Sequence, residues 1–203
     1  MAICPIWGTI SPKYMTKGNK IIRLGGGNAL KRLTASSFLT AAYVALSFFC
    51  VRMGNYTITL APLPIILSAV LFGPIEGVCV AALGEFLVQV ALYGFTPTTA
   101  IWMAAPLFRP LLIGLVSLGY SRKGEALEDH WVAFLLSILS ASLLVTGLNT
   151  LALYLDSLIY GYPFAFAIVE TLIRVAFGLA TAAICFLLSR PLIRSIRSLM
   201  NSK

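Results

Sequence analysis

The sequence has 203 residues, of which 59% are hydrophobic and only 11% are charged, and its mean hydropathy is +0.92. A soluble globular domain does not need so many apolar residues for its core. The composition therefore excludes a soluble fold and predicts a protein of the lipid bilayer. A helix crosses the roughly 30 Å of bilayer hydrocarbon with about 20 mostly apolar residues.

Long apolar segments, separated by turn residues or charges, fill positions 34 to 189. One of them is short and contains Pro62 and Pro64, and the pair Gly73-Pro74 separates it from the next. The pattern predicts an all-α integral membrane protein, a compact bundle of six transmembrane helices. We expect a mobile basic tail at 1–33, a six-helix substrate-binding domain at 34–190 and a basic tail at 191–203. The expected spans are residues 34–53, 58–72, 74–94, 98–120, 131–155 and 163–189.

The positions of lysine and arginine predict the orientation of the spans, because cytoplasmic flanks carry an excess of positive charge. Twelve of the fifteen cationic residues lie before the first span, in the 121–130 loop or after the last span. With six spans these segments share one side of the membrane, so both termini are expected in the cytoplasm. The net charge of +8 then reflects topology and contact with anionic lipid, and no nucleic-acid partner is expected. The twelve residues are Lys13, Lys17, Lys20, Arg23, Lys31, Arg32, Arg122, Lys123, Arg190, Arg194, Arg197 and Lys203.

The sequence lacks the motifs of the common enzyme classes. Its four cysteines, at 4, 50, 79 and 185, are widely spaced, and His130 is its single histidine, so we predict neither a zinc site nor a redox pair. It contains no GxSxG, HExxH or Walker sequence. We therefore expect a protein that is not an enzyme and binds no metal or cofactor. Any energy from ATP must come from another subunit.

Charged residues inside the predicted spans are the strongest functional signal. An ionisable group at mid-depth costs about 2.5 to 3.5 kcal/mol on insertion scales and normally faces the interior of a bundle. Two prolines, Pro106 and Pro110, flank Arg109, and a proline inside a membrane helix frees carbonyl oxygens that only protein or a cavity can satisfy. This break beside a charge predicts a contact with a carboxylate or phosphate. The charged residues deep inside the spans are Glu85, Arg109, Glu170 and Arg174, and Arg52 lies at an outer end.

Two arrangements of these charges remain open. In one, Glu170 neutralises Arg174, which lies four residues away on the same helix face, and Glu85 neutralises Arg109. Such internal ion pairs would fix the packing without any ligand. In the other arrangement the charges line an outward-facing cavity, to which the fifth span contributes the polar face formed by Ser142, Thr146 and Asn149.

A resemblance to a known family is carried by "LPIILSAVLFGPIEGVCVAALGEFL", at 63–87. It resembles the second and third spans of the substrate-binding S components of energy-coupling-factor (ECF) vitamin transporters, which typically read P-x-x-x-x-A-x-x-x-G-P-x-x-G-x-x-x-x-x-x-x-D. Glu85 occupies the position of the usual aspartate. The residues that match the pattern are Pro64, Ala69, Gly73, Pro74 and Gly77.

Two further segments extend the resemblance over roughly residues 35 to 190. "AAYVAL", at 41–46, is similar to the small-residue surface by which S components pack on their coupling subunit; Ala41 and Ala45 lie one turn apart and Ser37 continues the strip. Packing within the chain is the alternative for this strip. "LNTLALYLDSLIYGYPF", at 148–164, is similar to the folate-type branch, but the chain departs from that branch early in the fourth and sixth spans. Pantothenate is therefore the alternative to folate.

The resemblance implies a substrate-binding subunit of an ECF-type importer in the bacterial cytoplasmic membrane. Such a subunit binds a vitamin at its outer face and topples in the membrane when a transmembrane coupling subunit and two ATPase subunits drive it. Arg109 and Arg174 would then hold an anionic group, Asn149 and Thr146 would hydrogen-bond the ligand, and aromatic residues would stack on it or close the site. The expected substrate-binding residues are Glu85, Tyr93, Trp102, Arg109, Thr146, Asn149, Tyr154, Glu170 and Arg174.

Two other classes of protein compete with this interpretation. Membrane scaffold proteins of the rod-shape apparatus share a small six-helix layout and bind protein partners in place of a vitamin. An intramembrane enzyme built on Glu85 and Glu170 is disfavoured, because no nucleophile, metal cluster or cofactor motif accompanies these two carboxylates.

Overall fold

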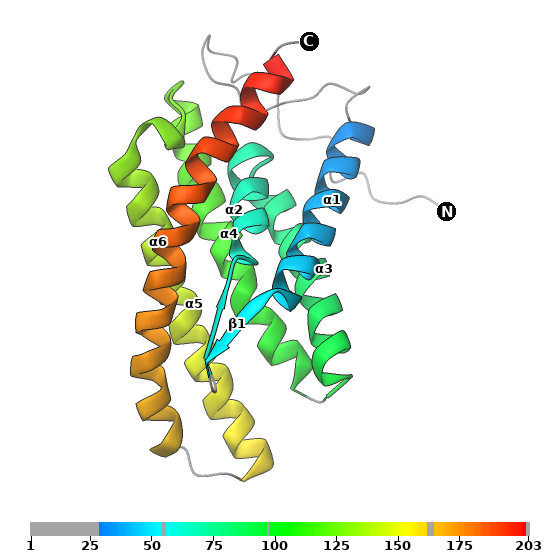
Figure 1. Ribbon diagram of the computed structural model, residues 1–203, viewed down its shortest axis with the longest axis vertical. Coiled ribbons are helices and arrows are strands. Elements are labelled where there is room, and N and C mark those ends of the chain that lie inside the picture. The colour runs from blue at the N-terminus through cyan, green and yellow to red at the C-terminus, as the bar shows by residue number, and fades with distance from the viewer. Residues whose placement is uncertain (1–28, 54–55, 97, 162–164, 202–203) are drawn as a thin grey trace.

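The computed structural model describes residues 29–53, 56–96, 98–161 and 165–201. Within these ranges the chain forms six α-helices that run up and down a bundle, with an antiparallel β-hairpin after the first helix (Figure 1). A short 3₁₀ helix, η3 (Leu127–Asp129), precedes the fifth α-helix. The other elements are α1 (Ala29–Phe48), β1 (Cys50–Met53), β2 (Tyr56–Thr59), α2 (Pro62–Leu71), α3 (Pro74–Tyr93), α4 (Thr99–Arg122), α5 (Trp131–Tyr160) and α6 (Ala165–Asn201).

Among the described residues, four helical segments are long and apolar enough to cross a membrane: α3, α4, α5 and the Ile173–Ser198 part of α6. No more than a third of each span is buried within the protein. Large apolar side chains such as Leu83, Leu136 and Leu187 are exposed on their outer faces. Apolar surface of this extent is stable in lipid, where helices satisfy their own backbone hydrogen bonds. These helices therefore agree with the membrane protein that the composition predicts.

The structure corrects the predicted boundaries around the first two spans. The prediction that the first helix continues to residue 53 is wrong, because α1 ends at Phe48 and Cys50–Met53 pair with Tyr56–Thr59 as a hairpin. The prediction that the second helix begins at residue 58 is also wrong. Strand β2 contains an aromatic and three β-branched residues, which favour extended backbone. Pro62, at the first helical position, then begins α2.

Helix α2 is short and completely enclosed. Its ten residues reach only about 15 Å at 1.5 Å per residue, so it cannot cross the hydrocarbon layer alone. All ten are buried, and Ile65, Ile66, Ala69 and Val70 are inaccessible to solvent. They pack in the core of the bundle with residues of α3, α4, α5 and α6. Helix α2 is thus the centre of the fold.

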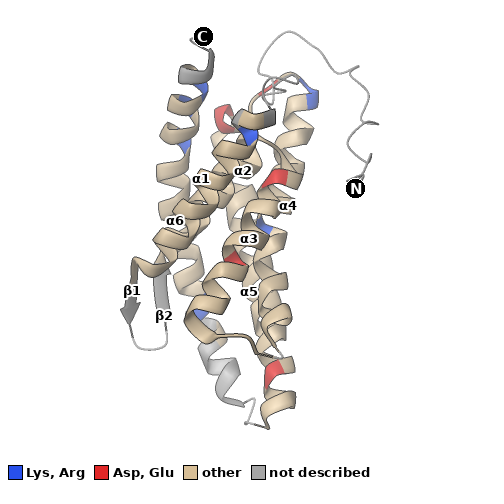
Figure 2. Ribbon diagram, turned by 90° about the vertical axis from the view of Figure 1, so that its right-hand side faces the viewer, with Lys and Arg blue, Asp and Glu red and all other residues tan. Residues whose placement is uncertain are grey.

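Helices α1 and α6 extend into segments that were predicted to be tails. Helix α1 begins at Ala29, within the predicted 1–33 tail, whose residues 1–28 lie outside the described part of the chain. Helix α6 continues to Asn201 because its last turns are anchored: Arg197 forms an ion pair with Glu128 at 3.0 Å, and Arg194 lies 3.4 Å from Asp129. Ala29 and Asn201 lie at the same end of the bundle, where Figure 2 shows lysine and arginine gathering.

Helices α3 and α4 approach each other closely at Gly114. A Cβ atom at this position would lie 2.5 Å from the Cα atom of Pro74, which is too short for any real contact. The Gly73-Pro74 corner between α2 and α3 therefore packs directly on the backbone of α4. This contact fixes the position of α2 along the axis of the bundle.

We expect Gly114→Ala to lower the free energy of unfolding by about 1 to 3 kcal/mol, because the added methyl group has no space against Pro74. Thermal unfolding of the purified protein in detergent measures this effect. The control is Gly119→Ala on the same helix, where nothing lies within 4 Å of the added atom. Removing a helical glycine there should leave stability unchanged or raise it by about 0.5 to 1 kcal/mol. Equal losses in both variants would contradict the packing argument.

Candidate functional site

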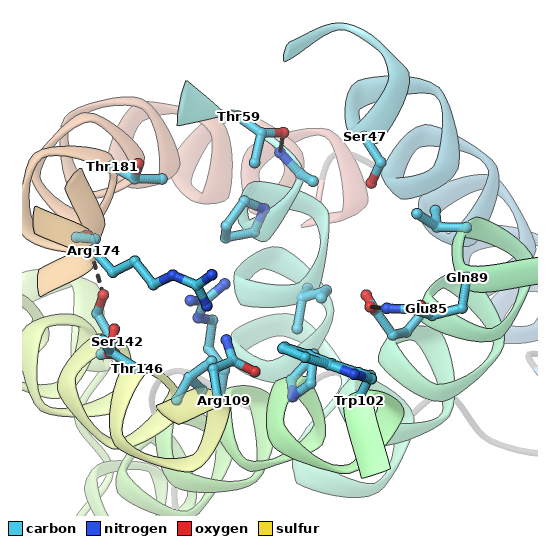
Figure 3. Close-up of a pocket in the computed structure, with 18 of the residues that line it drawn as sticks. Ser47, Thr59, Glu85, Gln89, Trp102, Arg109, Ser142, Thr146, Arg174 and Thr181 are labelled. Carbon is cyan, nitrogen blue, oxygen red and sulfur yellow. Dashed lines mark hydrogen bonds between the residues drawn. The ribbon is translucent and has the colours of Figure 1, made fainter. Parts of the chain in front are cut away.

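A cavity of about 710 Å³ lies at the N-terminal end of α2. Its walls come from all six α-helices and from Cys50 and Thr59 of the hairpin (Figure 3). Its lining includes Tyr93 and Trp102, on either side of the connection between α3 and α4, and this connection lies at the end of the bundle opposite the start of α1 and the end of α6 (Figure 1). This volume is within the range of about 300 to 1,000 Å³ that is typical of small-molecule sites. The lining combines apolar side chains, such as Ile65 and Val88, with charged and hydroxyl groups.

Two arginines enter the cavity from different helices. Arg109 of α4 and Arg174 of α6 both line it, and their side chains point toward one another (Figure 3). Arg109 is half-buried, and within the described ranges it has no hydrogen bond and no ion pair. Its five N–H donors therefore have no acceptor among the described residues. Such a guanidinium is a ready contact for a carboxylate or phosphate.

A carboxylate lies on the other side of the cavity. Glu85 is buried, and it accepts hydrogen bonds from the hydroxyl of Tyr43 and, at 2.9 Å, from the amide nitrogen of Gln89 (Figure 3). No ion pair joins Glu85 to Arg109 in the described part of the chain, so the structure does not show the direct pairing considered above. The cavity thus has an acidic side, stabilised by neutral donors, and a basic side. Glu170 belongs to α6, but its side chain lies outside the described residues.

The polar face of α5 forms the wall beside Arg174. Ser142 donates to the backbone carbonyl of Gly178 at 3.1 Å, and Thr146 donates to the carbonyl of Ser142 at 2.9 Å. Both hydroxyls are therefore satisfied by backbone. Asn149 also lines the cavity, and no described residue hydrogen-bonds its amide. Asn149 is thus the α5 side chain best placed to offer both a donor and an acceptor to a ligand.

Two of the three predicted aromatic residues reach the cavity. Trp102 and Tyr93 line it near the connection between α3 and α4. Tyr154 is not a lining residue and is 41% exposed. It follows Asn149 by five residues, which turns it by about 140° around α5 at 3.6 residues per turn. The structure therefore places Tyr154 on another face of the helix.

The prediction missed several lining residues that helical spacing indicates. Asp156 follows Asn149 by seven residues, and Thr181 follows Arg174 by seven, so each shares a helix face with a predicted residue. Gln89 follows Glu85 by four residues, for the same reason. A search for polar residues one or two helical turns after Glu85, Asn149 and Arg174 would have found all three.

The small-residue strip of α1 lies on the outer surface of the bundle. Ser37, Ala41 and Ala45 are exposed, whereas Leu39 and Tyr43, between them in sequence, are buried. The strip therefore does not pack against the described part of the chain. A surface of small residues in lipid allows another helix to approach closely.

Comparison with known proteins identifies the family. Residues 27–198 match the family described as "ECF-type riboflavin transporter, S component". The chain is an ECF S component. This confirms the resemblance read from the motifs, whereas the assignment to the folate-type branch stays a prediction. S components are the substrate-binding subunits of transporters and are not enzymes.

Solved structures of S components share this fold. The S component for biotin from an ECF-type ABC transporter has a TM-score of 0.64 and 20% identity, covering 84% of this chain and 95% of its own. ThiT from Listeria monocytogenes has a TM-score of 0.63 and 18% identity over 84% and 97% of the two chains. The S component of a bacterial ECF transporter has a TM-score of 0.59 and 19% identity over 84% and 98%. No curated protein matches the sequence.

The hydrogen bond from Tyr43 to Glu85 joins α1 to α3 inside this S component. Tyr43 packs against Gly84, where an added Cβ atom would lie 2.4 Å from its ring. Removing the hydroxyl would leave a buried carboxylate oxygen with one donor fewer, a loss of about 1 to 3 kcal/mol.

We therefore expect Tyr43→Phe to lower the thermal stability of the purified protein without ligand. The matched control is Tyr93→Phe, because Tyr93 is 68% exposed and its hydroxyl has no hydrogen bond to a described residue. Thermal unfolding in detergent compares the two. A similar change in both variants would show that the bond to Glu85 contributes nothing.

Proposed function

We propose that this S component captures a small anionic vitamin in the cavity at the N-terminal end of α2, for ATP-driven uptake. The observation that carries the proposal is Arg109, whose guanidinium lines the cavity without a hydrogen bond or ion pair to any described residue. An unpaired charge inside a membrane bundle is expensive and normally marks a ligand or ion site. A bound anion would supply the missing acceptor.

The geometry of the two arginines favours a carboxylate or phosphate. Their side chains converge from α4 and α6, so an anion between them would contact both guanidiniums and reduce their mutual repulsion. Helix α2 begins at the cavity with Pro62, and the positive end of its dipole adds to the attraction for an anion.

The rest of the cavity restricts the class of vitamin. Trp102 offers an aromatic face, and Glu85 with Gln89 offers acceptors and a donor on the side away from Arg174. Folate combines carboxylates with a heteroaromatic ring that carries N–H donors, so it uses both sides. Pantothenate, a smaller carboxylate with hydroxyls, uses mainly the basic side. Riboflavin is the alternative, because the family description names it and Trp102 suits a flat ring, but riboflavin has no anionic group for Arg109.

The proposed topology places the cavity on the outer face of the bacterial cytoplasmic membrane. All six helices would cross or enter the bilayer, with both termini in the cytoplasm. The gathering of lysine and arginine at the end that carries Ala29 and Asn201 supports this orientation. The vitamin site then opens outward, as uptake requires. A transmembrane coupling subunit and two ATPase subunits are the proposed partners.

We expect the purified protein to bind folate or pantothenate more tightly than riboflavin. Arg109→Ala should weaken binding of the anionic vitamin at least about tenfold, because a charge-assisted hydrogen bond contributes about 1.5 to 3 kcal/mol. Calorimetric titration of each vitamin into detergent-solubilised protein measures both effects. Native mass spectrometry of the freshly purified protein shows which small molecule it already carries.

The control for this prediction is Arg122→Ala, which removes the same charge from the exposed C-terminal end of α4. Its affinity should equal that of the wild-type protein. Unchanged affinity in Arg109→Ala contradicts the role of Arg109. Tight binding of riboflavin alone favours the alternative ligand. A protein that binds none of these three vitamins contradicts the proposed class of ligand.

The exposed strip of α1 is the proposed contact with the coupling subunit. Changing Ala41 and Ala45 together to leucine should abolish vitamin uptake in cells that contain the complete transporter, because larger side chains prevent close helix approach. Vitamin binding by the isolated subunit should persist, since both positions lie outside the cavity. Uptake assays and titration separate the two effects.

The matched control for the strip is Ala91→Leu, an exposed small-to-large change on α3. It should leave both uptake and binding intact. If the α1 double variant also transports normally, the strip is not the coupling surface. If it loses vitamin binding as well, its effect lies in the fold of the subunit.

A further inference from the structure

A second hollow, of about 460 Å³, lies on the surface of α6, far along the helix from Arg174. It belongs to the end of the bundle that carries Asn201, so it is separate from the vitamin cavity. Its composition is distinctive because apolar residues and arginines alternate with helical spacing. The lining residues are Phe186, Leu187, Arg190, Pro191 and Arg194.

The two arginines of this hollow are held by the segment that precedes α5. Arg190 donates from its Nε atom to the backbone carbonyl of Glu128 at 3.1 Å, and Arg194 lies 3.4 Å from a carboxylate oxygen of Asp129. The carboxylate of Glu128 is itself bound to Arg197 at 3.0 Å. Each guanidinium has five N–H donors. The contacts with described residues use one donor of Arg190 and one of Arg194. The remaining donors have no acceptor among the described residues.

The charges near the hollow do not cancel. Arg190, Arg194 and Arg197 carry three positive charges, and Glu128 and Asp129 carry two negative ones, which leaves one net positive charge. Both acids belong to η3, so they contact the arginines from the side of the protein.

An apolar surface continues the hollow toward the middle of the bundle. Leu187 is 68% exposed, while Phe186 is partly buried and packs against Phe134 with ring centroids 5.7 Å apart. Pro191 has no N–H to donate to the carbonyl of Leu187, four residues earlier, so a backbone acceptor lies beside the arginines. The hollow therefore presents cationic donors, then an acceptor, then apolar surface along one face of the helix.

We propose that this hollow binds an anionic phospholipid. The phosphate would lie between Arg190 and Arg194, a headgroup hydroxyl would donate to the carbonyl of Leu187, and an acyl chain would cover Leu187. Basic pockets at the ends of membrane helices bind acidic headgroups in this way. A free phosphate would leave the exposed Leu187 uncovered, so the lipid is the better fit. The inference rests on the fold as a membrane protein and is independent of the vitamin.

Native mass spectrometry of the full chain, with added dioleoylphosphatidylglycerol or dioleoylphosphatidylcholine, tests the site. Phosphatidylglycerol should bind more tightly than phosphatidylcholine. Arg190→Gln with Arg194→Gln should weaken binding of phosphatidylglycerol about 30-fold, since each arginine near an anionic lipid contributes about fivefold. Arg190 also anchors η3, so its replacement could act through the fold, and Leu187→Glu provides a second test. This variant adds a negative charge at an exposed position and should weaken the binding of phosphatidylglycerol by a similar factor.

The control variant is Arg122→Gln with Lys123→Gln, which removes two exposed charges from the same end of the bundle. It should retain phosphatidylglycerol, and inorganic phosphate should not compete for the site. Vitamin titrations of every variant should match the wild-type protein, which separates this proposal from the function of the cavity. Equal binding of the two lipids overturns the proposal. So does an equal loss in the control variant, or unchanged binding in both hollow variants.

Discussion

The length of α2 is the constraint on which the site depends. Its ten residues reach about 15 Å, roughly half of the hydrocarbon thickness, and the surrounding helices bury every one of them. The neighbouring helices continue past its N-terminus at Pro62, so the space below α2 has no helix to fill it. This space is the cavity of about 710 Å³. The close contact of Gly114 with Pro74 holds the other end of α2 in place and so fixes the depth of the cavity.

The cavity places opposite charges on different walls without pairing them directly. Glu85 is satisfied by the neutral donors of Tyr43 and Gln89, and Arg109 is left with donors that no described residue accepts. Had Glu85 bonded Arg109, the two charges would have formed a packing pair of the kind that fixes many membrane bundles. Tyr43 also connects the cavity to the surface, because the helix that carries it exposes Ala41 and Ala45. A ligand that moves Tyr43 would therefore act on α1 directly.

The sequence predicted the features that depend on hydrophobicity and charge. Intramembrane arginines marked the cavity, and Arg109, Arg174, Asn149 and Trp102 all line it. It did not predict the hairpin or the true start of α2, because the short segment Tyr56–Thr59 borders an apolar run, and the boundary between a short strand and a helix depends on the packing around it. Tyr154 is close to Asn149 in sequence but does not line the cavity, because five residues turn it to another face of α5.

Helix α6 shows how surroundings decide what an arginine does. Arg197 is bound to the buried carboxylate of Glu128, and together with Arg194 it extends the helix beyond the segment that hydrophobicity alone predicts. Arg174 instead lines the cavity at the N-terminal end of α2. Arg190 and Arg194 lie between these two cases, because η3 accepts one hydrogen bond from each, and their other donors have no acceptor among the described residues. The positive charge alone does not tell whether each of these four arginines marks the cytoplasmic side of the membrane or binds a ligand. The acceptors supplied by described residues distinguish Arg197, which is paired with the carboxylate of Glu128, from Arg109, which has no acceptor among them.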